Sequence, residues 1–394
     1  MVSNETQRVV VVGGGISAAR TCAALRRQGF AGEITLVGAE IHLPYDRPPL
    51  SKDVLAGRRD STELPFDVAK LDVTARTGTV AVGLDLTNRV VRTSSGDQPF
   101  DAVVIATGSA PVTLPGTGEQ RVLRTIDDAL ALRERLVPGA RIVVIGASWI
   151  GAEVTSAARD RGCHVTCVEA GPAPLAQALG AEIGAALTTW WDGVDLRTST
   201  LVDQVAPEGV RLQDGECLEA DAVVVGIGVR PETAWLAGSG LALDRGVVVD
   251  ACMRTSVPGV VAVGDVANRW SPRLGRYLRL DHWDDAGTAP AVAAASLLAH
   301  LSGSAESPAP HDPVPYFWSD QFGHKLQYVG AHDSADHLTV EAGQPGPHEP
   351  PGPGLLATWR DPDGTLTAWL GVDRMRELVA ARRSVGTVPE PVPT

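Results

Sequence analysis

The 394-residue sequence has few lysines, no excess of positive charge and no long apolar run. Its basic side chains are almost all arginine, which suits local anion sites better than a diffuse basic field. The net charge of −13 argues against nucleic-acid binding. No uninterrupted apolar run reaches the roughly 18–20 residues that a membrane helix needs. Because the start also lacks a signal-peptide pattern, we expect a cytoplasmic protein without membrane attachment.

The cysteines form no redox pair. Cys163 and Cys167 are the nearest two, in a C-x3-C arrangement on an expected strand, which places them on one face or nearly so. No second pair of ligands accompanies them, so we expect no metal site and ordinary buried thiols. No C-x2-C or C-x4-C motif lies beside a strand–turn–helix unit, either among these two or among Cys22, Cys217 and Cys252.

A repeated pattern of strand, glycine turn and helix is the main positive feature. The segment RVVVVGGGISAARTCAALRRQGFAGEITLVGAE predicts a strand at 8–12 and a helix from about 16 to 28, with a second strand at 33–37. The segment RIVVIGASWIGAE begins the same plan at 141. A chain of this length forms two or three domains, and two such units predict two dinucleotide-binding domains.

Later apolar strands complete each unit. DAVVIATGSAP at 101–111 is similar to DAVVVGIGVRP at 221–231, and another short strand is expected at 260–263. The order implies that the second unit is inserted into the first. We therefore expect an α/β fold with two nested Rossmann-like domains and a C-terminal α+β domain. The expected boundaries are 1–112 with 246–313 for the first domain, 113–245 for the second and 314–394 for the third.

The third domain is expected to be an antiparallel sheet with a terminal helix. KLQYVGA, HLTVEAG, LLATWRD and LTAWLGV each have the composition of a strand, and a helix is expected around 374–383. The proline-rich stretch at 302–315 is interpreted as a linker, and the segment at 341–354 as a turn-rich loop.

Each glycine turn has the residues that a pyrophosphate requires. Gly13 permits the tight turn, Gly15 allows phosphate to approach the backbone, and Ala18 lets the helix pack closely on the strand. The N–H groups of Ile16 and Ser17 begin a helix whose N-terminus attracts anions. The second turn has the same layout: Gly146 begins it, Ser148 takes the place of the middle glycine, Trp149 and Ile150 begin the helix, and Gly151 closes the motif.

An acidic residue after the second strand of each unit predicts a ribose contact. Glu169 ends HVTCVE, where a carboxylate accepts both adenosine ribose hydroxyls and repels a 2′-phosphate, so NADH should be preferred to NADPH. A surface glutamate without that role is the alternative. In the first unit Glu40 is the only nearby acid, and it lies one or two residues beyond the usual place.

Several motifs together resemble the NADH-dependent ferredoxin reductases of oxygenase and cytochrome P450 systems. They are HLPYDRPPLSKDVL at 42–55, IATGSAP at 105–111, GVRPETAWL at 228–236, VVAVGDVA at 260–267, LRLDHWDDA at 278–286 and PYFWSDQFGHKLQYVG at 315–330. The resemblance implies an FAD domain, an inserted NAD domain and a C-terminal interface domain. It also implies that NADH reduces the flavin, which then passes single electrons to a ferredoxin that serves an oxygenase or P450.

The resemblance assigns roles residue by residue. The first glycine turn would bind the FAD pyrophosphate, and the second would bind NADH. Lys52 would lie near the flavin ring with Arg47 beside it, and Asp265 would hold a ribityl hydroxyl. Trp283 would lie over the pyrimidine end of the flavin. The remaining expected cofactor contacts come from Ala81, Ala106, Thr107, Gly108, Arg124, Gly226, Gly228 and Gly264.

Four of these side chains are expected at the reacting centre: Lys52, Glu153, Trp149 and Trp318. Glu153 matches a carboxylate near the nicotinamide carboxamide, and the alternative is an acid favoured by the helix dipole. Trp318 would reach the flavin from the C-terminal domain, and Trp149 would gate the nicotinamide pocket. Ordinary packing is the alternative for both tryptophans, and a solvated surface lysine is the alternative for Lys52.

Other functions are weighed against this one. A disulfide reductase needs a thiolate beside the flavin, and PYDRPPLSK contains no cysteine. An NADH oxidase or quinone-type reductase with a small acceptor stays open, as does a slow-turnover redox-sensing flavoprotein. For the ferredoxin we expect a local basic docking face, because ferredoxins are generally acidic. Its candidate residues are Arg269, Arg273, Arg276 and Arg279, with a salt-bridged surface loop as the alternative.

Overall fold

The computed structural model describes residues 6–341 and 354–386. The chain forms two compact units, each assembled from three segments. Unit 1 contains Met1–Asp46, Thr62–Ala110 and Arg230–Pro313. Unit 2 contains Arg47–Ser61, Pro111–Val229 and Val314–Thr394.

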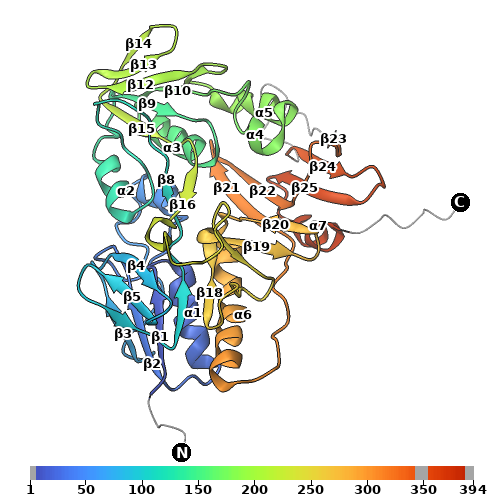
Figure 1. The fold of residues 1–394 in the computed structure, drawn as a ribbon. Helices are drawn as coiled ribbons and strands as arrows, with labels where there is room; N and C mark the ends of the chain where they lie inside the picture. The colour runs from blue at the N-terminus through green and yellow to red at the C-terminus, as the bar shows by residue number, and fades with distance from the viewer. Residues whose placement is uncertain (1–5, 342–353, 387–394) are drawn as a thin grey trace, which may run out of the picture. The chain divides into compact units, whose positions relative to one another are not determined.

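Unit 1 is built on a five-stranded parallel sheet in the order β18-β7-β1-β2-β3. The strands are β1 Arg8–Val12, β2 Glu33–Val37, β3 Val73–Arg76, β7 Ala102–Ile105 and β18 Val260–Ala262. Their valine-rich sequences suit a sheet that is buried on both faces. Helices α1 (Ile16–Arg27) and α6 (Trp283–Ser302) pack together on one face, as Figure 1 shows.

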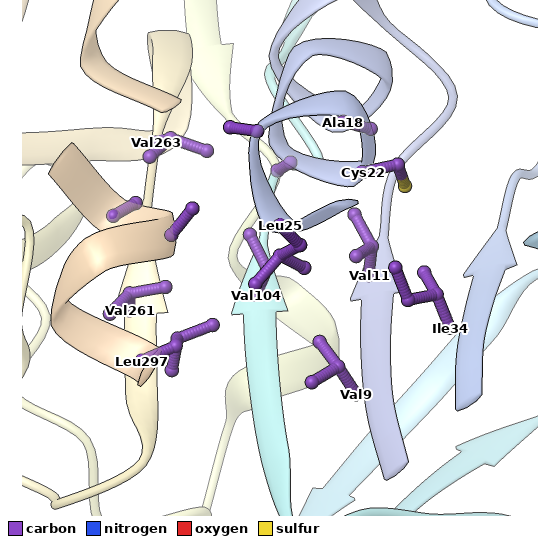
Figure 2. Close-up of a cluster of buried hydrophobic side chains, with 14 of the residues drawn as sticks. Val9, Val11, Ala18, Cys22, Leu25, Ile34, Val104, Val261, Val263 and Leu297 are labelled. Atoms are coloured by element: carbon purple, nitrogen blue, oxygen red, sulfur yellow. The ribbon is translucent and has the colours of Figure 1, made fainter. Parts of the chain in front are cut away.

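Side chains of that sheet and of the two helices form one of the hydrophobic cores of unit 1. In Figure 2, Val9 and Val11 of β1 and Val104 of β7 lie beneath Leu25 of α1, and Leu297 of α6 completes the layer. These side chains are at most 1% exposed. The opposite face is covered by an antiparallel sheet of β4 Ala81–Asp85, β5 Val90–Thr93 and β6 Gln98–Pro99. Elsewhere in this unit β17 Val247–Val249, β19 Ala267–Ser271 and β20 Arg276–Leu278 form a small sheet.

Unit 2 repeats the parallel plan with four strands in the order β11-β10-β9-β15. The strands are β9 Arg141–Ile145, β10 His164–Val168, β11 Asp195–Arg197 and β15 Ala222–Val225, and α3 (Trp149–Asp160) follows β9. An antiparallel sheet of β12 Val202–Ala206, β13 Gly209–Leu212 and β14 Cys217–Glu219 contributes to one core. The other helical elements are η1 Leu50–Val54, α2 Ile126–Arg133, α4 Ala176–Leu179, α5 Ala181–Leu187 and η2 Thr188–Trp191.

The C-terminal part of unit 2 is a five-stranded antiparallel sheet in the order β21-β22-β25-β24-β23. The strands are β21 Tyr316–Gln321, β22 His324–Gly330, β23 His337–Glu341, β24 Leu356–Arg360 and β25 Leu366–Val372. Helix α7 (Leu378–Ser384) starts later than the sequence predicts, because a turn at residues 375–377 precedes it. The interior of the loop expected at 341–354 lies outside the described residues.

The predicted strand–turn–helix repeats and the antiparallel C-terminal sheet are confirmed. Helix α1 ends at Arg27, and Gly29 beyond it has a φ of 93°, a conformation that glycine adopts easily. The β4–β6 and β12–β14 sheets were not predicted, because their short strands have no strong alternation of apolar and polar residues. The predicted boundaries of the FAD, NAD and C-terminal domains stay a prediction.

Candidate active site

The first glycine turn of unit 1 has the shape that a dinucleotide requires. Gly13 has a φ of 135°, and a Cβ atom there would lie 2.0 Å from the carbonyl oxygen of Ala106, so a side chain is excluded. A Cβ atom on Gly15 would meet no atom within 4 Å, which leaves room for a phosphate. Ala18 is fully buried where the helix leaves the turn. These residues fit a bound pyrophosphate.

The carboxyl ends of β7 and β18 lie beside this turn. Ala106 follows β7 directly, and the Thr107 hydroxyl donates to the Glu232 carbonyl at 2.8 Å. Gly264 follows β18 with a φ of 74°, and a Cβ atom there would lie 2.5 Å from Ser17 Oγ. The predicted residues of three separate segments therefore meet at one edge of the sheet, where α/β proteins bind ligands.

Strand register explains why Glu40 is displaced from the usual acid position. Arg8 pairs with Glu33 in unit 1 as Arg141 pairs with His164 in unit 2, so Gly38 corresponds to Glu169. Gly38 packs on the turn itself, since its hypothetical Cβ would lie 3.5 Å from the Cα of Gly14. Glu40 lies two residues further on and accepts a hydrogen bond from the Tyr45 hydroxyl.

Trp283 lies at the start of α6 and is fixed within unit 1. Its indole Nε1 donates to Asp46 Oδ1 at 2.6 Å. The preceding residue, His282, is the N-cap of α6. Burial lowers the pKa of His282, although the nearby carboxylates of Asp265 and Asp285 oppose that shift. Asp265 and Trp283 thus belong to the same region of this unit.

The second glycine turn, in unit 2, is also sterically constrained. Gly146 has a φ of 97°, and a Cβ atom there would lie 2.5 Å from the carbonyl oxygen of Gly226. A Cβ atom on Gly151 would lie 1.8 Å from the carbonyl oxygen of Gly146, so the third position of the motif must be glycine. The Ser148 hydroxyl donates to Gly226 at 3.2 Å, so it is directed at the end of β15. Gly228 has open space around it, and Ile150 is 41% exposed at the start of α3.

Glu169 connects the end of β10 to the second turn. One carboxylate oxygen, Oε2, accepts a hydrogen bond from Ala147 N at 2.7 Å, and Oε1 accepts one from Gly171 N at 2.6 Å. These two bonds hold the carboxylate beside the turn, which is the place that a ribose-binding acid occupies.

Trp149 is half-buried and packs on the C-terminal sheet. Its ring lies 4.5 Å from that of Phe317 in an edge-to-face arrangement, with an interplanar angle of 74°. Trp318 points to the other face of β21 and stacks at 6.0 Å with Tyr316. The packing alternative is therefore supported for Trp149, and a gating role stays a prediction.

Lys52 and Glu153 form a buried ion pair, with Lys52 Nζ 2.9 Å from Glu153 Oε1. The side chains are 17% and 4% exposed. Lys52 lies on η1, a single π-helical turn of a kind often found at functional sites. Glu153 is on the second turn of α3, inside the helix. The two serines whose hydroxyls donate to it, Ser51 and Ser319, were not singled out from the sequence. Ser51 lies within the motif HLPYDRPPLSKDVL and Ser319 within PYFWSDQFGHKLQYVG, so their membership of these motifs was the only sequence signal that pointed to them.

The other predicted FAD contacts lie in two places. Arg47 Nη1 donates to the Arg124 carbonyl, and Arg124 N donates to Asp128 Oδ2 at 3.1 Å, so these two arginines meet in unit 2. Ala81 begins β4 and Gly108 follows β7 with a φ of 69°, both in unit 1.

The arginine docking hypothesis is wrong for Arg269. Its side chain is 3% exposed, and it pairs with Asp312 at 3.1 Å and with Asp285 at 3.4 Å. Arg279 forms an ion pair with Asp281, while Arg273 is exposed. An arginine in a hydrophilic segment is expected to be exposed. Arg269 is buried because two aspartates compensate its charge.

The cysteines are free thiols, and four of the five are buried. Burial raises the pKa of Cys22 and Cys167 to about 12 and also raises that of Cys163. Cys163 and Cys167 face the same hydrophobic core, as predicted. Within the described parts of the chain, no group of three or more His, Cys, Asp or Glu side chains could hold a metal ion.

Comparison with known protein families now identifies the class. A family model described as pyridine nucleotide-disulphide oxidoreductase matches residues 7–289, and one described as reductase C-terminal matches residues 316–392. The chain therefore belongs to the pyridine nucleotide-disulphide oxidoreductase family, whose members use FAD and NAD(H).

Individual relatives are ferredoxin reductases. The chain is 37% identical to the anthranilate 1,2-dioxygenase system ferredoxin–NAD(+) reductase component of Burkholderia cepacia, over 97% of this chain and 95% of that protein. The crystal structure of Fdr9 matches with a TM-score of 0.92 and 50% identity, over 98% of this chain and 96% of the other. Putidaredoxin reductase in its covalent complex with putidaredoxin matches with a TM-score of 0.86 and 30% identity, over 96% and 93%. The resemblance inferred from the sequence is confirmed.

Among the helices of residues 6–341 and 354–386, none combines the length and the apolar character needed to cross a membrane.

Proposed function

We propose that this protein is an FAD-dependent NADH:ferredoxin oxidoreductase that supplies an oxygenase or a cytochrome P450. One observation carries the proposal: each unit has a complete dinucleotide turn. In addition, the segment with Lys52 contains no cysteine and forms an ion pair, whereas a disulfide reductase needs a thiolate. Burial raises the pKa of the Cys22, Cys163 and Cys167 thiols, which disfavours the thiolate that such an enzyme needs.

The overall reaction balances when one NADH reduces two ferredoxins. NADH loses two electrons and a proton, each ferredoxin accepts one electron, and the products are NAD+, two reduced ferredoxins and one proton. Bound FAD would supply the conversion from hydride transfer to single-electron transfer. The protein contributes position and electrostatics.

The predicted site residues are assigned accordingly. We assign the first turn, with the ends of β7 and β18, to FAD, and the second turn with Glu169 to NADH. Glu169 supports NADH over NADPH because its carboxylate repels a 2′-phosphate. Lys52 and Glu153 are assigned to the reacting centre, and Trp318 stays a candidate contact to the flavin.

The partner is inferred from the relatives. The Burkholderia protein is a component of a dioxygenase system, and putidaredoxin reductase is bound to putidaredoxin in its complex. Both support a ferredoxin as the acceptor here. We also propose a cytoplasmic location, since the five cysteines form no disulfide, as is usual in reducing compartments.

Anaerobic stopped-flow reduction tests the proposal. Purified protein with FAD should be bleached rapidly by NADH and more slowly by NADPH. Reoxidation should then be fast with a [2Fe–2S] ferredoxin and slow with oxygen or a quinone. Fast reoxidation by oxygen or quinone alone would make the protein an oxidase or quinone reductase. Slow turnover with every acceptor would favour a redox sensor, and failure to bind FAD would overturn the whole proposal.

A further inference from the structure

The Glu153 carboxylate has more partners than an ion pair needs. Oε1 accepts hydrogen bonds from Lys52 Nζ at 2.9 Å, Ser319 Oγ at 2.5 Å and Asp320 N at 3.3 Å. Oε2 accepts a hydrogen bond from the Ser51 hydroxyl. A carboxylate that is 4% exposed loses nearly all its hydration, and these donors replace it.

The donors come from two segments distant in sequence. Ser51 and Lys52 are neighbours on η1, whereas Ser319 and Asp320 lie on β21 of the C-terminal sheet. Glu153 on α3 lies between them, and all three segments belong to unit 2. The C-terminal sheet therefore supplies part of the environment of this carboxylate.

The two hydroxyls determine the orientation of the carboxylate. Lys52 is a single charge on a flexible stem, and by itself it would not define the plane of its partner. Ser51 and Ser319 donate to different oxygens, so together they fix the rotation of the carboxyl group. A charged hydrogen-bond acceptor gains more from each donor than a neutral one does.

We propose that Ser319 and Ser51 are positioning residues, which hold the Glu153 carboxylate in the orientation that retains Lys52 and presents the pair to the hydride-transfer site. The inference rests on the proposed function for the purpose of the pair, but the positioning itself concerns only contacts within unit 2. The C-terminal domain accordingly has a second role besides the one expected for partner binding.

The state of the Lys52–Glu153 ion pair can be measured through the chemical reactivity of Lys52, because the chain contains only three lysines: Lys52, Lys70 and Lys325. Trace acetylation followed by mass spectrometry gives the labelling rate of Lys52 relative to exposed Lys70 in the same sample. In Ser319→Ala or Ser51→Ala, we expect that ratio to rise about tenfold, the factor produced by losing one hydrogen bond to a charged group. The rate of flavin reduction by NADH should fall by about the same factor, because the same hydrogen bond is lost.

Ser156→Ala is the matched control. Ser156 on α3 is buried like the other two serines, and its hydroxyl accepts a hydrogen bond from Phe322 N at 2.8 Å, but no hydrogen bond joins it to the Glu153 carboxylate. It should therefore leave the labelling ratio and the reduction rate near wild type. If Ser319→Ala and Ser51→Ala match Ser156→Ala in both measurements, the positioning role is refuted.

A double-mutant cycle with Glu153→Gln separates positioning from general stability. If Ser319 acts through Glu153, Ser319→Ala should change the labelling ratio little in the Glu153→Gln background. An equal effect in both backgrounds would refute the inference. If wild type is not reduced by NADH, the proposed function fails, while the labelling ratio still tests the positioning.

Discussion

Replacing Arg269 by methionine tests the buried charge network of unit 1. The Arg269 guanidinium donates to the His311 carbonyl at 2.8 Å and to Asp312 Oδ1 at 3.1 Å, and it lies 3.4 Å from Asp285 Oδ1. His311 Nε2 is 3.0 Å from the same Asp285 oxygen. The Arg269→Met side chain keeps an apolar stem but carries no charge, so two poorly hydrated aspartates would lose their cation.

The expected cost follows from burial. Side chains of Arg269, Asp285 and Asp312 are 3%, 13% and 14% exposed. Removing one partner from a buried ion pair costs about 3–5 kcal/mol, because the remaining charge is left uncompensated. We expect that loss in the free energy of unfolding from urea titrations, followed by circular dichroism and by release of flavin fluorescence.

The control is Arg254→Met in the same unit. Arg254 pairs with Asp250 at 2.8 Å, but the two side chains are 44% and 43% exposed. An exposed pair contributes at most about 1 kcal/mol. If Arg269→Met destabilises the protein no more than Arg254→Met, the buried network does not stabilise the unit.

The pH dependence of the same network has a definite sign. Burial alone would raise the pKa of Asp285, but its hydrogen bond to His311 and the nearby charges of His311 and Arg269 outweigh burial, so the pKa is lowered. A carboxyl with a lowered pKa in the folded state stabilises the protein above its unfolded pKa of about 3.9. That contribution is lost as the pH falls through the folded pKa. The stability difference between wild type and Arg269→Met should therefore shrink at the most acidic values.

Three further predictions concern the candidate site and its surroundings. Glu169→Gln should lower kcat/KM for NADH about tenfold, because it removes the charged acceptor for the ribose hydroxyls, and it should lower kcat/KM for NADPH less. Equal decreases in kcat/KM for both cofactors would mean that Glu169 only stabilises the turn. Trp149→Ala should lower the thermal midpoint through loss of the Phe317 contact and change the KM for NADH; a lower midpoint with unchanged KM would leave Trp149 a packing residue. Burial lowers the pKa of His282 and His332, so the unfolded state binds protons at a higher pH than the folded state does. The free energy of unfolding should therefore fall as the pH drops below about 6.5. His282→Gln should make this fall with pH less steep, and an unchanged steepness would contradict a lowered pKa for His282.

Local patterns were sufficient to predict the two dinucleotide turns. Gly13 and Gly146 are each preceded by an apolar strand and followed by a helix, and residues that are adjacent in the sequence determine this order. The structure adds the reason for each glycine, since the nearest obstacle to a side chain comes from a distant segment at Ala106 or Gly226. Such close approaches have no local signature.

Burial of polar side chains was the main property that the sequence did not reveal. On β19, Arg269 is 2% exposed and the adjacent Trp270 is 38% exposed, the reverse of what hydrophobicity predicts. The cause is non-local, because the compensating carboxylates of Asp285 and Asp312 come from α6 and from the segment after it. Ser51 and Ser319 were missed for the same reason: a serine becomes a positioning candidate only once its carboxylate partner is known.

The contacts of α3 join the helix of the second dinucleotide turn to the C-terminal sheet. Trp149, Glu153 and Ser156 are spaced i, i+4 and i+7 and therefore occupy one face of the helix. Each meets β21 or the turn that follows it: Trp149 contacts Phe317, Glu153 contacts Ser319, and Ser156 contacts Phe322. The helix whose first turn is assigned to the nucleotide phosphates thus packs, from Trp149 to Ser156, on β21 and the residue that follows it. Ser319 therefore links that strand directly to the Lys52–Glu153 pair, because its hydroxyl and the Lys52 ammonium donate to the same carboxylate oxygen.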